Sequence, residues 1–244
     1  MALLKMGRNK ILYLICLLFL ACREEKQEKR SLTFAYCILN PRFKHQEVIV
    51  DSLYGFESEI NDTSGISGAK VFLLEVETGE TINFVETEKK GIYRDTMREN
   101  WVKPLFTYDL FVAFQRDTLW GRTKVPDTFR ITFPNNFDTI PLNDFDSIIW
   151  RRSLGRKVYF LAVIPPDTAK PLIPIVTEDT FVSLAPFRNF YFDTTAFYTI
   201  KVCAWDENRY RYMVMKNLEP DTLGDGLGHF ASQTEDTISV FVRR

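Results

Sequence analysis

The chain has few of the side chains that most often carry out chemistry. Among its 244 residues there are two histidines, His45 and His229, and four cysteines. It has no His-x-x-x-His, no cysteine pair at zinc-binding spacing, no Gly-x-Ser-x-Gly and no glycine-rich phosphate loop. We therefore expect neither enzymatic activity nor a bound metal or cofactor. A hydrolase whose two carboxylates meet only in the folded chain remains an alternative.

An excess of basic residues is also missing. The sequence has 31 lysines and arginines against 32 aspartates and glutamates, for a net charge of -1. A chain that is not basic lacks the electrostatic footprint of a nucleic-acid-binding protein, so we expect no nucleic acid partner. Helical periodicity is also absent over any useful length, whereas hydrophobic residues reach 45% and aromatic residues 14%, enough for a sizeable core.

The N-terminus carries the clearest signal in the sequence. An apolar run over 11–21 follows three basic residues, Lys5, Arg8 and Lys10, which is the pattern of a secretory signal. The run is roughly half of the ~20 residues that a membrane-spanning helix needs. Its end, Leu18-Phe19-Leu20-Ala21-Cys22, resembles the lipobox of bacterial lipoproteins. This resemblance implies that residues 1–21 are removed and that Cys22 is acylated; an ordinary secretory signal cut elsewhere is the alternative.

Residues 22–31 are almost entirely polar and are expected to form a solvated tether. Removing three basic residues with the signal from a chain of net charge -1 leaves -4. Arg23-Glu24-Glu25 is similar to short signals that send lipoproteins to the outer face of the outer membrane. We expect an outer-membrane protein held by the lipid on Cys22, on either the surface or the periplasmic face.

From residue 32 the sequence predicts an all-β protein. Short segments rich in β-branched and aromatic residues recur between turn signals, as in β-sandwiches. The strands are expected at 32–39, 47–54, 69–76, 81–85, 91–94, 108–114, 117–125, 147–150, 158–163, 198–206 and 237–242. We divide them into two tandem sandwich domains, 32–133 and 134–244.

Each predicted domain resembles a known module. Ser67-Gly68-Ala69-Lys70-Val71, Gly91-Ile92-Tyr93 and Thr107 to Val112 resemble landmarks of immunoglobulin-like, transthyretin-like domains. The second half, with Trp150 and the alternating Tyr198, Ile200, Val202 and Ala204, resembles fibronectin type III. That resemblance makes Tyr198 a candidate tyrosine corner. The whole arrangement is similar to uncharacterised cell-envelope lipoproteins often associated with TonB-dependent outer-membrane receptors.

Three residues are candidate ligand contacts. Alternation on the strand at 198–206 points Lys201 and Trp205 outward, where an exposed ring could anchor a protein or stack on a sugar. Alternatively, Trp205 packs beneath the long stretch 206–234. Trp101 lies in a loop-like segment and is the third candidate, whereas Trp120 and Trp150 are interpreted as core.

We interpret two cysteines and two aspartates as structural residues without a binding role. Cys37 and Cys203 are expected to be free or buried thiols, with pairing as the alternative in an oxidising compartment. Asp221 and Asp225 lack the ligand spacing of a calcium loop. We therefore expect a binding or assembly role at the cell envelope, with a structural spacer as the alternative from another class.

Overall fold

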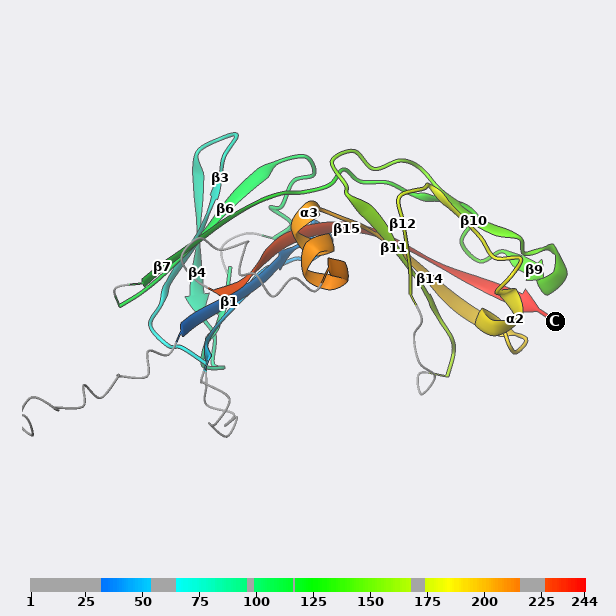
Figure 1. Cartoon of the computed structure of the whole chain (residues 1–244), viewed down its shortest axis with the longest axis horizontal. Helices are drawn as coiled ribbons and strands as arrows, with labels where there is room; N and C mark the ends of the chain where they lie inside the picture. The colour runs from blue at the N-terminus through cyan, green and yellow to red at the C-terminus, as the bar shows by residue number, and fades with distance from the viewer. Residues whose placement is uncertain (1–31, 54–64, 96–98, 116, 168–173, 216–226) are drawn as a thin grey trace, which may run out of the picture. The chain divides into compact units, whose positions relative to one another are not determined.

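The computed structural model describes residues 32–53, 65–95, 99–115, 117–167, 174–215 and 227–244, and this part of the chain is all-β (Figure 1). Its first strands are β1 (Leu32–Leu39), β2 (Glu47–Leu53), β3 (Lys70–Glu75), β4 (Glu80–Glu86), β5 (Ile92–Arg94), β6 (Thr107–Phe114) and β7 (Asp117–Lys124). There follow β8 (Ile131–Phe133), β9 (Thr139–Pro141), β10 (Ser147–Trp150), β11 (Val158–Ile164), β12 (Ile175–Thr177), β13 (Phe181–Ser183), β14 (Ala196–Trp205) and β15 (Leu227–Arg243). The short helices are η1 (Leu142–Asp144), α2 (Arg188–Tyr191), α3 (Glu207–Tyr210) and the π-helix η2 (Arg211–Met215).

The strands form a large sheet and a small one. The large sheet has the order β12-β11-β14-β15-β1-β2-β5-β4-β3-β6-β7, and β9 pairs with the end of β15. The small sheet has the order β13-β10-β8. The predicted β-sandwich class is confirmed.

The first hydrophobic core lies between β1, β2 and β5 on one side and β3, β6 and β7 on the other. Alternation places Val71 and Leu73 of β3 and Leu110 of β6 in this core. β7, at one end of the large sheet, also contacts β15. There the Thr123 hydroxyl donates a hydrogen bond to the Ser232 hydroxyl at 2.8 Å. Side-chain hydrogen bonds therefore join these two strands.

The second core lies between the small sheet and β11, β14 and β15. The predicted inward face of β14 is confirmed, because all four of its side chains are fully buried: Tyr198, Ile200, Val202 and Ala204. Trp150 is also core, as expected, and meets the Tyr159 ring edge-on at 5.2 Å.

Tyrosine hydroxyls connect three strands to the loops before them. Tyr198 accepts a hydrogen bond from the Thr194 amide at 3.0 Å, which is the predicted tyrosine corner. Tyr108 on β6 accepts from the Lys103 amide at 2.9 Å, and Tyr159 on β11 accepts from the Ser153 amide at 2.7 Å. Each bond satisfies a loop amide and holds the loop to a buried ring.

The last strand is longer than the sequence predicts and serves both cores. The prediction covered 237–242, whereas β15 begins at Leu227. Its first part runs parallel to β1, with pairs from Phe34 and Leu227 to Leu39 and Ser232. Its second part is antiparallel to β14. Phe230 therefore lies in the first core and Val240 in the second. The predicted domain division between residues 133 and 134 stays a prediction.

Cys37 and Cys203 are free and buried, as the first interpretation expects. Burial raises the pKa of Cys203 to about 12 and shifts the pKa of Cys37 in the same direction. Cys37 lies in the first core, and Cys203 packs with Trp205 on the outer face of β14.

Several predictions fall outside the described residues: the signal at 1–21, the tether at 22–31 with Cys22, and the loop with Asp221 and Asp225. In the part of the chain that is described, no helix has the length and apolarity needed to cross a bilayer.

Candidate binding surface

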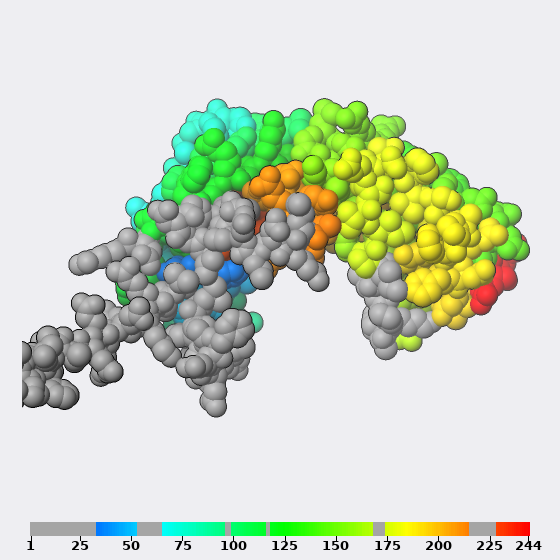
Figure 2. Space-filling model, in the orientation of Figure 1, coloured from blue at the N-terminus to red at the C-terminus, as the bar shows by residue number. Residues whose placement is uncertain are grey.

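Trp205 is buried, with only 3% of its surface exposed. It lies on the outer face of β14, where its ring stacks on the Phe160 ring with the two ring centroids 4.6 Å apart. Arg209 of α3 lies 5.6 Å from its ring, and Tyr210 packs against the same cluster. Figure 2 shows α3 and η2 as an orange patch at the surface of the molecule. The ring is therefore not exposed, and the alternative, in which Trp205 packs beneath the residues that follow β14, is confirmed.

Lys201 and Trp101 are also engaged within the protein. The Lys201 ammonium lies 2.8 Å from the Glu235 carboxylate. Trp101 does lie in a loop but is 4% exposed, and it meets Phe84 and Tyr108 edge-on at 6.4 and 5.5 Å. Binding by these residues stays a prediction, but neither tryptophan presents an accessible ring to a ligand.

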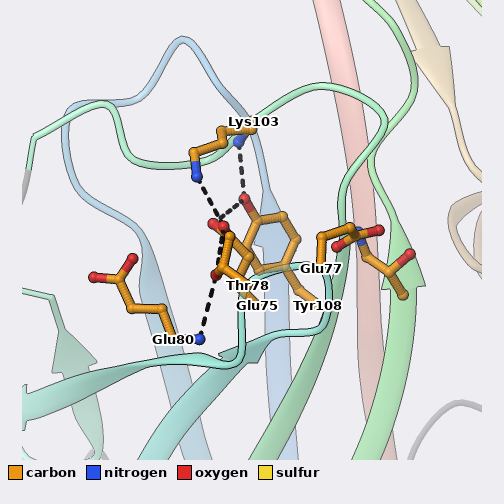
Figure 3. Close-up of polar contacts among 7 residues, drawn as sticks. Glu75, Glu77, Thr78, Glu80, Lys103 and Tyr108 are labelled. Carbon is orange, nitrogen blue, oxygen red and sulfur yellow. Dashed lines mark hydrogen bonds and ion pairs between the residues drawn. The ribbon is translucent and has the colours of Figure 1, made fainter.

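Beside Trp101 is a buried carboxylate with several donors (Figure 3). Glu75 accepts hydrogen bonds from the Lys103 ammonium and the Thr78 hydroxyl, both at 2.8 Å, and from the Tyr108 hydroxyl at 3.3 Å. Burial alone would raise the pKa of Glu75, but the bonds from Lys103 and Thr78 outweigh it and lower the pKa. Because its donors are all internal, this cluster holds a strand to two loops and is not poised for catalysis.

One row of half-buried and exposed aromatic residues lies on the outer face of β3, β6 and β7. Phe72 pairs with Phe111 across β3 and β6, and Phe111 pairs with Trp120 across β6 and β7. We call these three residues the aromatic row. Trp120 is 42% exposed, so its interpretation as core is wrong. The neighbouring Leu119 points inward, and alternation therefore turns Trp120 to solvent.

The row is flanked by positive charge. The Lys70 ammonium lies 5.6 Å from the Phe72 ring, and the Arg122 guanidinium lies 5.8 Å from the Trp120 ring. Arg122 also donates two hydrogen bonds to Asp109, at 2.6 and 2.7 Å. The bidentate pair fixes the guanidinium beside the tryptophan.

The rings of the row show mainly their edges to solvent. Phe72 and Phe111 stack at 4.9 Å with their planes 12° apart, so each covers a face of the other. With strands about 4.8 Å apart, the row is roughly 10 Å long. It is therefore a narrow apolar ridge and not a set of free ring faces.

Two neighbouring carboxylates of the described residues are held in ion pairs. Glu235 and Asp236 line one pocket together, but Glu235 pairs with Lys201 at 2.8 Å and Asp236 with Arg42 at 2.7 Å. Neither carboxylate is free to act as an acid or a base. In the same part of the chain, no group of three or more histidine, cysteine, aspartate or glutamate side chains could hold a metal ion.

No protein-family model matches the sequence, and no curated protein matches it. Among solved structures, the chain is similar to the FN1–FN3 domains of chicken CNTN1, with 12% identity and a TM-score of 0.26 over 87% of this chain and 67% of that one. It is also similar to a tetra-tandem repeat from the extending region of a large adhesion protein, with 10% identity and a TM-score of 0.26 over 87% of this chain. The chain spans about half (49%) of the length of that second structure.

Proposed function

We propose that this chain is a lipid-anchored cell-envelope protein that binds a protein partner through the aromatic row. The observation that carries the proposal is the cross-strand alignment of the half-buried Phe72 and Phe111 with the exposed Trp120. A pure spacer would not need aligned aromatic side chains on a solvated sheet face. Tryptophan and arginine are common where binding energy concentrates, and here Trp120 and Arg122 lie together.

The ring geometry favours a protein over a sugar as the partner. A sugar stacks on the free face of an aromatic ring, whereas Phe72 and Phe111 cover one another and Arg122 lies beside the Trp120 ring. An apolar ridge with the Lys70 ammonium at the Phe72 end suits a protein groove with an acidic group at that end of its rim. An outer-membrane receptor is the specific partner that the lipoprotein resemblance suggests.

Anchoring is tested by labelling cells with a fatty acid while they express the wild-type chain or Cys22→Ala. We expect label on the wild type and none on the variant, because the lipobox cysteine is the acceptor. Stable anchoring needs more than one acyl chain, which a multiply acylated Cys22 would supply. Protease treatment of intact cells then distinguishes the surface face from the periplasmic face. An unlabelled wild type would mean that the protein is simply secreted.

Partner binding is tested by photo-crosslinking in cells, with the crosslinker placed at Thr118, an exposed neighbour of Trp120 on β7. We expect one discrete protein adduct in the wild type and a loss of at least about tenfold in Trp120→Ser, since buried interface tryptophans commonly contribute 2 kcal/mol or more. The matched control is Phe181→Ser, which removes an aromatic ring that is 52% exposed on β13. Equal adducts in both variants, or no adduct in the wild type, would refute the row as the binding surface.

A further inference from the structure

Three arginines without carboxylate partners line a pocket of about 480 Å³. They are Arg130, which precedes β8, and Arg151 and Arg152, which follow β10. All three are exposed, and within the described residues none makes an ion pair. The remaining walls come from the β1–β2 turn, from Thr128 and Phe129, and from β15. The pocket shares no residue with the aromatic row.

The backbone holds two of these arginines opposite one another. Trp150 pairs with Ile131 across β10 and β8, and the next amide, that of Arg151, donates to the Arg130 carbonyl at 2.9 Å. Like charges directly opposite on paired strands destabilise a sheet. Arg152 follows at once in the sequence and adds a third positive charge. An arrangement that is unfavourable in the empty protein becomes favourable if an anion lies between the guanidinium groups.

The acidic residues of the pocket do not supply that anion. The Asp236 carboxylate accepts from Arg42 at 2.7 Å and from the Ile131 amide at 2.8 Å. The Glu235 carboxylate accepts from Lys201 at 2.8 Å and from the Asn40 side-chain amide at 3.1 Å. Both carboxylates are therefore already neutralised. The excess of positive charge stands out in a chain whose net charge is -1.

We propose that this pocket binds a small multiply charged anion, and specifically a phosphate ester or diphosphate. Guanidinium groups match phosphate oxygens with paired hydrogen bonds, and three of them can neutralise more than one negative charge. The volume lies within the roughly 300–1,000 Å³ of small-molecule sites. The lining is mostly polar, with Phe129 and Pro41 as its apolar residues, so charge recognition supplies the affinity.

The test is calorimetric titration of the full chain in detergent at low salt, with inorganic pyrophosphate and with glycerol 3-phosphate as probes. We expect saturable binding that weakens at least about tenfold, or about 1.4 kcal/mol, in Arg151→Gln and in Arg130→Gln. Tighter binding of glycerol 3-phosphate would indicate a lipid headgroup as the source of the phosphate, and tighter binding of pyrophosphate a soluble ligand.

Arg94→Gln is the matched control, because it removes another exposed arginine that lies on β5, outside the pocket, and pairs with Glu47. It should bind both probes as the wild type does. The ligand-free Arg151→Gln protein should also melt no lower than the wild type, because the substitution relieves repulsion. The inference is overturned if neither probe binds the wild type, or if Arg94→Gln weakens binding as much as Arg151→Gln does.

Discussion

Replacing Phe230 with alanine is expected to lower the free energy of unfolding by about 3–5 kcal/mol, as large-to-small changes at buried aromatic positions do. Phe230 is fully buried, yet it belongs to the core that residues near the N-terminus build. It pairs with Cys37 across β15 and β1. We therefore expect the loss to appear first in the first core around Cys37, which lies more than 190 residues away in the sequence. Denaturant unfolding of the full chain measures the total effect.

The two buried thiols report where the damage occurs. Pulsed alkylation followed by mass spectrometry should show faster labelling of Cys37 than of Cys203 in Phe230→Ala. The matched control is Val240→Ala, a buried position on the same strand that packs in the second core. In Val240→Ala, Cys203 should instead be labelled faster than Cys37. If both thiols gain reactivity equally in both variants, the two cores unfold as one unit and the expectation is wrong.

Acid is expected to destabilise the fold through His229, which is fully buried on β15. Burial, assisted by Arg209, lowers the pKa of His229 to about 3 from an ordinary value of 6.5. The centroids of the His229 and Tyr212 rings lie 4.1 Å apart, and among the described residues neither nitrogen of His229 has a hydrogen-bond partner. Because the unfolded chain binds the proton more readily, stability is complete above about pH 6.5 and falls as the pH drops toward 3. At about pH 4 the loss amounts to about 3 kcal/mol.

The titration of Asp206 changes stability in the opposite direction to that of His229, so the two contributions must be measured separately. Burial raises the pKa of Asp206 to about 6, so the folded state takes up its proton first and gains stability as the pH falls from 6 toward 3.8. His229→Phe keeps the stacked ring and removes the titration. Relative to wild type, its free energy of unfolding should therefore rise by about 3 kcal/mol between about pH 7 and pH 4.

Asp206→Asn provides the complementary control, because its difference from wild type should change with the opposite sign over the same range. Asparagine keeps an acceptor for the Arg209 amide, which Asp206 holds at 2.8 Å. A pH-independent difference between His229→Phe and wild type would contradict the buried, neutral histidine.

The strands that the sequence predicts well are those whose pattern is local. The predicted ranges 32–39 and 147–150 coincide with β1 and β10, because alternation and flanking turn residues define them without distant partners. The first part of β15 was missed for the opposite reason. Its partner β1 lies at the other end of the chain, and a parallel pair of distant segments leaves no local signature.

The exposure of the candidate rings also depends on contacts that the local pattern does not contain. Alternation correctly turned Trp205 away from the second core, but it does not reveal that α3 and Phe160 cover the ring. The same rule, applied from the buried Leu119, predicts that Trp120 faces solvent, whereas residue type alone favours a core position for a tryptophan. The arginine pocket draws on segments far apart in the sequence, so only the adjacent Arg151 and Arg152 hinted at it.

The parallel pairing of β1 with β15 also has a mechanical meaning. In a parallel pair, the start of one strand and the end of the other lie at opposite ends of the ladder. Pulling the chain apart at Leu32 and at Arg243 would therefore load all the hydrogen bonds between these two strands at the same time, in shear. The bonds would not be broken one by one from an end. A protein held to a membrane through residues before Leu32, and pulled from the end of β15 at Arg243, would carry that load on the pairing of β1 with β15.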